Sequence, residues 1–259
     1  RLLAKSSMEI LAISTWNPFP PDNGSKLRAQ YLLRDLAQRH NVTVVAFEPS
    51  LRAPESRRVE LGHGAVELVL VPDDPFRAVH VPAWKRYWVP TPPSYWPSSL
   101  MRACIDELAR TREWDAVIAI QLHVAQYALS IPAARKSVLD LDTSLSHQML
   151  ERYQGSRGAK QRTQAYISWK KAERYEAQIS RQFKTCAVAS PVEIALTQQL
   201  VDGSDCRVVL VANGVDCDYN QPGLLPKVHG SLVYNGALTY SVNFDAMQYF
   251  LAEIYPLVK

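Results

Sequence analysis

The sequence has few cysteines, no long apolar run and no strong excess of charge, and each absence excludes a class of protein. No apolar run approaches the roughly 18 residues of a membrane-spanning helix. The four cysteines show no CxxC spacing and no histidine at a zinc-ligand distance, so we read them as reduced thiols of a cytoplasmic protein. The net charge of +4 suits an anionic ligand but is too small for a dedicated nucleic-acid-binding protein.

The composition is that of a globular protein. Of the 259 residues, 47% are hydrophobic and 21% are charged, which excludes disorder and low-complexity arrays. This length is enough for one large domain, or for one domain and part of another. The chain starts without Met and stops at Lys259 inside an apparent helix, so we expect a fragment of a longer protein.

Strand-like and helix-like segments alternate along most of the chain. The run VTVVAF is β-branched and continuous, as in a strand buried on both faces of a parallel sheet. The pattern predicts an α/β fold, a Rossmann-like parallel sheet with helices on both faces. We expect strands over 8–14, 42–47, 65–71, 116–120, 136–141, 186–189 and 207–212, and helices over 25–40, 99–112, 159–183 and 191–201.

The alternation breaks after residue 212, and residues 216–230 form a loop with two prolines and two glycines. A new strand, 231–236, and a helix from about 244 to 255 then begin. We therefore predict an N-terminal domain over 1–215, a linker over 216–230 and the first β-α unit of a second Rossmann-like domain over 231–259.

Ligands of open α/β sheets bind beyond the carboxyl ends of the strands, so polar residues at strand exits are the candidate site residues. Asp140 and Asp142 alternate with Leu141 and would face the same side of a strand, and Asp142 lies nearer its exit. We predict Asp142 as a catalytic residue that orients a hydroxyl or acts as a base. After another strand, we predict His123 as a catalytic residue that donates to an anionic substrate or acts as a base. The alternatives are a helix cap for Asp142 and a structural role for His123.

Two glycine turns follow strands and open helices. Gly24 and Ser25 follow the first strand, and Gly236 ends the strand over 231–236. Glycine lets a ligand approach the backbone, and the free N–H groups at a helix start suit a phosphate. Alternatively, Gly24 and Ser25 form only a turn with Ser25 as N-cap. The GxGxxG pattern is absent, which disfavours a dehydrogenase, although Glu48 ends the second strand where such an enzyme holds a ribose.

Further candidates lie at the domain junction and on the surface. Asn213, Gly214, Val215 and Asp216 would form an interdomain hinge. Residues 72–98 are rich in proline and aromatics, and with the net charge they motivate the hypothesis of peripheral membrane contact. The basic residues Arg152, Arg157, Lys160 and Arg162 either reach phosphates or belong to a solvated connection between helices.

Several motifs in series resemble the retaining glycosyltransferases of family four, which have the two-domain GT-B architecture. They are PxPPxxGxxxR with LLxxLAxRHxVTVV (Pro18 to Val45), ASPVE (Ala189 to Glu193), ANGVD (Ala212 to Asp216) and YNGALTYSVNFDA within Leu232 to Pro256. Their order spans nearly the whole chain, and the bacterial exopolysaccharide branch is the most similar.

The resemblance implies a hexosyltransferase-type enzyme that moves a sugar from a UDP- or GDP-sugar to a glycan or lipid-linked acceptor, with retention and no obligatory metal or cofactor. Gly24, Ser25, Gly236 and Asn243 would then lie near the donor phosphates. Asp142 falls where many relatives place a histidine close to the reacting sugar. We expect no nucleic-acid partner and a location in the cytoplasm or at the inner face of the membrane.

The resemblance also implies what this chain lacks. The Glu-x7-Glu segment that holds the donor sugar and ribose in this family is absent, so we expect no sugar transfer by these residues alone. The alternative function is a non-catalytic α/β module that binds a nucleotide or a glycan.

Overall fold

The computed structural model describes residues 7–76, 97–131, 136–223, 226, 228–239 and 241–258. The chain divides into two compact units, which meet between Gly214 and Val215. The Pro- and aromatic-rich segment predicted from the sequence lies largely outside the described residues. No described helix is long and apolar enough to cross a membrane.

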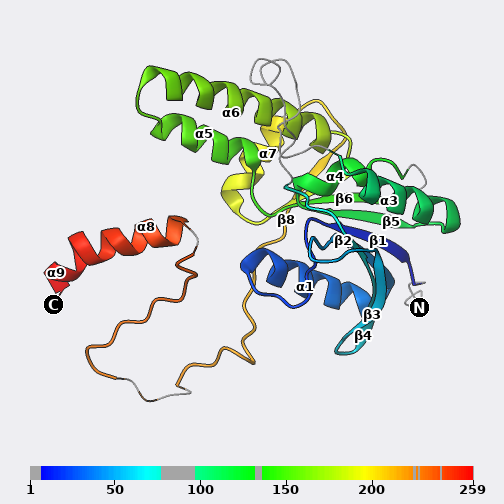
Figure 1. Cartoon of the computed structure of the whole chain (residues 1–259), viewed down its shortest axis with the longest axis horizontal. Helices are drawn as coiled ribbons and strands as arrows, with labels where there is room; N and C mark the ends of the chain where they lie inside the picture. Colours follow the sequence, from blue (N-terminus) through cyan, green and yellow to red (C-terminus); the bar gives the residue numbers. More distant parts are fainter. Residues whose placement is uncertain are drawn as a thin grey trace, which may run out of the picture. The chain divides into compact units, whose positions relative to one another are not determined.

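The first unit is an eight-stranded sheet in the order β3-β4-β2-β1-β5-β6-β7-β8 (Figure 1). All strands are parallel except β3, which pairs antiparallel with β4. The strands are β1 (Glu9–Ser14), β2 (Asn41–Phe47), β3 (Glu55–Leu61), β4 (Gly64–Val71), β5 (Ala116–Ile120), β6 (Lys136–Leu141), β7 (Thr185–Val188) and β8 (Arg207–Leu210). The α/β class and the parallel sheet predicted from the sequence are therefore confirmed.

Helices cover both faces of this sheet, which is why the central strands contain continuous apolar runs. They are α1 (Gly24–Ala37), α3 (Ser99–Thr111), α4 (Leu122–Ala128), α5 (Leu145–Gly155), α6 (Ala159–Ser180) and α7 (Pro191–Val201). Helix α1 packs on one face through Ala29 and Leu33, and α3 packs on the other through Met101 and Ile105 (Figure 1). The chain order reverses between β1 and β5, and this reversal creates the topological switch point of the sheet.

The two outer strands of the sheet differ. Strand β3, which the sequence analysis did not predict, forms a hairpin with β4 and exposes Glu55, Arg57, Arg58 and Glu60 at one edge. Gly64 opens β4 where the backbone of α1 passes very close, because an added Cβ would lie 2.5 Å from the Ala37 carbonyl oxygen. At the opposite edge, β8 has only four residues.

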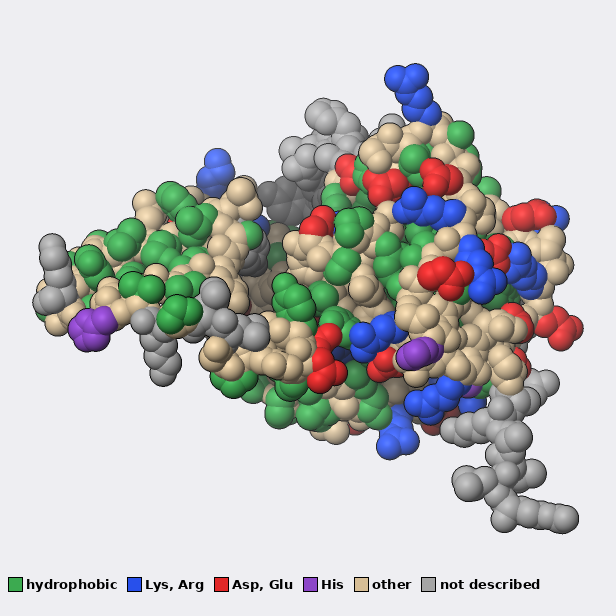
Figure 2. All heavy atoms as spheres, turned by 90° about the horizontal axis from the view of Figure 1, so that it is seen from below, with side chains coloured by type: hydrophobic (Ala, Val, Ile, Leu, Met, Phe, Trp, Pro, Cys, Tyr) green, Lys and Arg blue, Asp and Glu red, His purple; other side chains and the backbone are tan. Residues whose placement is uncertain are grey.

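The second unit contains α8 (Ser241–Tyr249), the π-helical turn η2 (Phe250–Ile254) and α9 (Tyr255–Val258). The predicted strand over 231–236 is wrong, because this segment is irregular in the structure. A strand is stable only when its backbone groups pair with a neighbour, and the described part of this unit contains no other strand. Hydrophobic side chains cover much of the unit's surface (Figure 2), among them Leu232, Val233, Phe244 and Leu251.

Candidate functional site

The carboxyl edge of the sheet at the switch point is the candidate functional site. The ends of β1 and β5 lie side by side there, and the Thr15 hydroxyl donates to the Ile120 carbonyl oxygen at 3.4 Å. The segment between β1 and α1 and the start of α4 border this point. In open α/β sheets, a ligand binds in the crevice formed where the chain order reverses.

Gly24 and Ser25 form the first turn of α1, at this edge. The N-cap is Asn23, whose side-chain oxygen accepts from the Lys26 backbone N–H at 3.0 Å, so the alternative of Ser25 as the cap is wrong. The N–H groups of Gly24 and Ser25 have no partner within the helix, because no preceding turn supplies carbonyl oxygens. A Cβ added at Gly24 would meet no atom within 4 Å, so the backbone there has open space beside it.

The Ser25 hydroxyl instead donates to the Asp142 carboxylate, across 117 positions of sequence. Two groups that we predicted for the same site from separate segments are therefore in contact. Asp142 is not the cap of α5, because Ser144 accepts the hydrogen bond of the His147 backbone N–H at 3.3 Å. The helix-cap alternative for Asp142 is thus wrong, and its carboxylate faces the start of α1.

Arg28, one turn further along α1, is buried and contacts both β6 and the segment that follows β8. Its Nη2 and Nε donate to the Asp140 carboxylate at 2.7 and 3.1 Å, and Nη1 donates to the Val211 carbonyl oxygen and the Asn213 side-chain oxygen at 2.7 and 2.8 Å. Burial is the largest single influence on the pKa of Arg28 and lowers it, but the hydrogen bonds to Asp140, together with the negative charges of Asp140, Asp142 and Glu193, raise the pKa above its ordinary value. The guanidinium stays charged and ties the predicted hinge residue Asn213 to α1 and β6.

Arg28 is a site residue that we did not predict from the sequence. The signal was available, because positions 25 and 28 lie on one face of a helix and Asp140 and Asp142 lie on one face of a strand. The two pairs meet in register, Ser25 with Asp142 and Arg28 with Asp140.

His123 lies one residue into α4, immediately after β5. Its ring packs edge-on against Phe76 with centroids 4.9 Å apart, and Phe76 in turn packs on Trp16 at 5.5 Å. Burial lowers the pKa of His123 to about 4, so the imidazole is neutral at pH 7. A neutral imidazole can accept a proton or a hydrogen bond, and the adjacent rings provide an aromatic wall.

Gln121 connects β5 to α4 in a strained backbone conformation. Its φ of 77° and ψ of 154° lie in a region that glycine occupies almost exclusively. The conformation is held in place because the Gln121 N–H donates to the Asp140 carbonyl oxygen at 2.9 Å. Its side-chain oxygen is buried, with no hydrogen-bond partner among the described residues. No sequence signal marks this residue, since strain at a single position leaves no pattern.

The remaining predicted residues belong to the junction and the second unit. Asp216 caps a turn, accepting from the backbone N–H groups of Asp218 and Tyr219 at 3.1 and 3.0 Å. Gly214 ends the first unit, and Val215 begins the second. In the second unit, the Asn243 side chain donates to the Ala237 carbonyl oxygen at 3.1 Å, and the ring of Tyr234 lies where a Cβ on Gly236 would fall.

Glu48, the residue that left a dehydrogenase possible, is engaged in local structure. Its carboxylate accepts from the Ser50 hydroxyl at 2.7 Å and from the Asn17 amide at 3.3 Å. These hydrogen bonds lower the pKa of Glu48 and hold the carboxylate against the loop after β1. Among the residues that the structure describes, no group of three or more His, Cys, Asp or Glu side chains could hold a metal ion.

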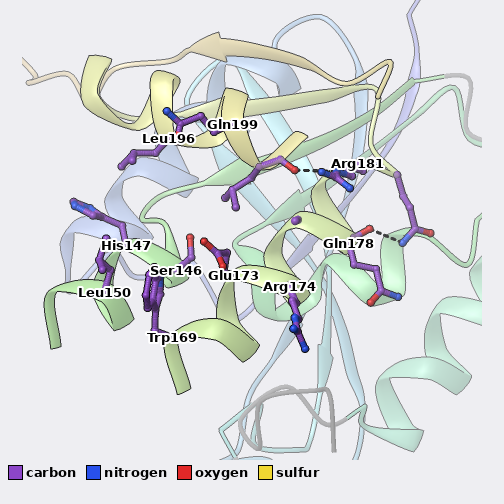
Figure 3. A pocket seen from close by; sticks show the side chains of 13 residues that line it. Ser146, His147, Leu150, Trp169, Glu173, Arg174, Gln178, Arg181, Leu196 and Gln199 are labelled. Atoms are coloured by element: carbon purple, nitrogen blue, oxygen red, sulfur yellow. Dashed lines mark hydrogen bonds between the residues drawn. The ribbon is translucent and has the colours of Figure 1, made fainter. Parts of the chain in front are cut away.

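A separate groove of about 1000 Å³ lies between α5, α6 and α7 (Figure 3). Apolar side chains of Leu150, Trp169 and Leu196 line it together with His147 and Glu173. It contains none of the site residues predicted from the sequence.

Comparisons with known proteins support the fold. No family model and no curated protein matches this sequence. Sucrose-phosphate synthase from Thermosynechococcus elongatus matches with a TM-score of 0.53 and 12% identity, over 81% of this chain and 49% of that chain. UGT2 of Phytolacca americana, complexed with UDP-2fluoro-glucose and pterostilbene, matches with a TM-score of 0.47 and 12% identity, over 82% of this chain and 55% of that chain.

This chain therefore spans about half the length of the sucrose-phosphate synthase that it matches. At this identity the similarity establishes the fold, which is that of one half of a GT-B glycosyltransferase chain.

Proposed function

We propose that this chain is the acceptor-side part of a retaining glycosyltransferase of family four. The enzyme moves a sugar from a UDP- or GDP-sugar to a glycan or lipid-linked acceptor, in the synthesis of exopolysaccharide or cell-surface glycans. The observation that carries the proposal is the convergence of the open start of α1 with Asp142 at the switch point of a GT-B-like sheet.

The chemistry of the proposed reaction explains the open helix start. When a nucleoside diphosphate leaves, negative charge develops on its phosphate oxygen, and a site without a metal must neutralise that charge with N–H groups and helix termini. The first turn of α1 offers free N–H groups beside Gly24, where no side chain obstructs a phosphate. Under the proposal, Gly236 and Asn243 approach the same diphosphate from the second domain, and residues 213–216 form the hinge.

The other groups at the sheet edge are suited to the acceptor and the reacting sugar. Asp142, positioned by Ser25, orients a sugar hydroxyl. Neutral His123 accepts a hydrogen bond from the acceptor beside the aromatic wall of Trp16 and Phe76. The unpartnered oxygen of Gln121 accepts a hydrogen bond from a bound ligand, which accounts for a strained residue at this position.

The test is sugar transfer by the longest open reading frame that contains these residues, with a panel of UDP- and GDP-sugars. Gly24→Ala should lower kcat/KM at least tenfold, because a methyl group would occupy the phosphate position although the fold has room for it. Asp142→Asn should lower kcat at least tenfold. The control is Gly155→Ala in α5, where an added Cβ also meets no atom within 4 Å and which should leave transfer unchanged.

Three results test separate parts of the proposal. Retention predicts a product with the anomeric configuration of the donor, measured by proton NMR. Nucleotide-sugar binding without transfer by the complete protein would instead favour the non-catalytic binding module. If Gly24→Ala and Gly155→Ala behave alike, α1 is not the phosphate site.

A further inference from the structure

The charge of the protein is concentrated in one short segment of the first unit. Residues 152–172 contain six of the 29 Lys and Arg residues and none of the 25 Asp and Glu residues. The rest of the chain has 23 basic and 25 acidic residues, so without this segment the formal charge would be negative. The net positive charge of the chain therefore resides in this segment.

The segment forms the far end of a helical hairpin. Helices α5 and α6 pack side by side and extend away from the sheet, with their connecting turn at the outer end (Figure 1). Arg152, Arg157, Lys160 and Arg162 surround this turn, and all four side chains are exposed. Lys170 and Lys171 follow on α6, about 15 Å further along at 1.5 Å per residue. We call the outer end of the hairpin, residues 152–171, the basic tip.

An aromatic cluster packs the two helices of the basic tip against each other. Tyr153 of α5 stacks on Trp169 of α6 with centroids 5.7 Å apart, and Tyr166 packs edge-on against both rings at 5.6 and 5.8 Å. Arg162 lies 5.0 Å from the Tyr153 ring centre and Lys170 lies 3.9 Å from that of Trp169. The rings are therefore already in contact with each other and with cations.

We propose that the basic tip docks the protein on a membrane surface that contains anionic phospholipids. The end of the hairpin, with its exposed cations, complements the plane of negative charge that such headgroups form. The four cations at the turn lie within residues 152–162, so one short stretch of chain presents four exposed positive charges. Tyr166, 45% exposed, adds an amphipathic ring of the kind that favours the membrane interface.

The same features argue against a nucleic acid as the partner. Single-stranded nucleic acids bind where bases stack on open aromatic faces within a positively charged groove. In the basic tip, the Tyr153 and Trp169 faces contact each other and the two cations, so these faces are not open for a base to stack on.

The experiment is co-sedimentation of the full 259-residue chain with large unilamellar vesicles. One set contains phosphatidylcholine and phosphatidylserine in a two-to-one ratio, and the other contains phosphatidylcholine alone. We expect binding to the anionic vesicles only, in about 0.1 M salt, and release in about 1 M salt, where the Debye length falls to about 3 Å.

Two triple variants locate the docking surface. Each Lys or Arg near an anionic surface strengthens binding about fivefold, so R152Q/R157Q/K160Q should lower the partition coefficient on the order of 100-fold. The matched control is R39Q/R52Q/K184Q, which removes the same charge from exposed positions outside the tip and should change the coefficient less than tenfold. Thermal melting confirms that both variants are folded.

Three outcomes would overturn the proposal. They are an absence of binding to anionic vesicles, an equal loss in the two variants, and tighter binding of a fluorescent single-stranded oligonucleotide than of the vesicles at equal phosphate concentration. The last result would assign the basic tip to nucleic acid. The assay contains no nucleotide sugar, so its outcome is independent of the proposed transferase activity.

Discussion

The backbone at Gln121 is strained, so we expect glycine to be more stable than alanine at this position, the reverse of the usual order. A residue with a side chain in this region of φ and ψ costs about 1–3 kcal/mol, because its Cβ clashes with the neighbouring backbone. Glycine has no Cβ and avoids this cost, but it loses about 0.5–1 kcal/mol relative to alanine through the greater freedom of the unfolded chain. We therefore expect Gln121→Gly to be more stable than Gln121→Ala, by about 1 kcal/mol.

Gln38 supplies the matched control. It is an exposed glutamine at the end of α1 with ordinary helical angles, φ −66° and ψ −22°. At this position alanine should be more stable than glycine by about 0.5–1 kcal/mol. Comparing glycine with alanine at both positions removes the effect of deleting the glutamine side chain, and the difference between the two comparisons, about 1–3 kcal/mol, measures the strain at Gln121.

The assay is urea denaturation of the four variants, followed by circular dichroism, with the free energy of unfolding taken from midpoints at a common slope. If alanine is more stable than glycine at position 121, as at position 38, the backbone there is not strained and the reasoning is refuted. The functional counterpart is that Gln121→Gly should lower ligand affinity while raising stability, since the amide and its constrained geometry are both lost.

Three further predictions concern the same region and its surroundings. Arg28→Met should lower the free energy of unfolding by about 3–5 kcal/mol, because it leaves Asp140 buried and unpaired. R28M/D140L should recover much of this loss. Equal destabilisation of the single and double variants in urea would contradict this expectation. The His123 imidazole binds a proton near pH 6.5 in the unfolded chain but only near pH 4 in the folded protein. Its contribution to the free energy of unfolding is therefore complete above pH 6.5 and is lost as the pH falls toward 4. The loss amounts to at most about 3 kcal/mol, and the difference in urea midpoint between wild type and His123→Gln should change over this range and not above it. Gly64→Ala should lower the free energy of unfolding by about 1–3 kcal/mol, because its methyl group would meet the backbone of α1, whereas Gly24→Ala should not lower it. Comparable melting temperatures for the two variants would contradict this expectation.

The sequence predicted the parts of the fold that depend on local pattern. Continuous apolar runs identified strands such as β2 and β5, because strands buried on both faces need no polar residues. Strand β3, with the sequence ESRRVEL, was missed because an exposed edge strand has few apolar residues to reveal it. The segment 231–236 has the composition of a strand but is irregular, since composition does not supply a pairing partner.

For the site, the sequence identified groups but not all of their contacts. The switch-point rule placed Gly24, Ser25 and Asp142 at one edge of the sheet, where Ser25 and Asp142 are in contact. Arg28 was not predicted as a site residue, because a charged residue on an amphipathic helix is usually exposed. Its four acceptor contacts come from segments more than 100 positions away, and only the assembled sheet brings them together.

The hairpin of β3 and β4 also affects how copies of this protein behave in concentrated solution. An unpaired strand at the rim of a sheet can template the addition of another chain, which begins aggregation. On β3, Glu55, Arg57, Arg58 and Glu60 would have to lose water for a second copy to stack against that rim. The opposite rim, β8, offers only four residues for such pairing. Both edge strands thus disfavour self-association: β3 because its charged side chains are hydrated, and β8 because it is short.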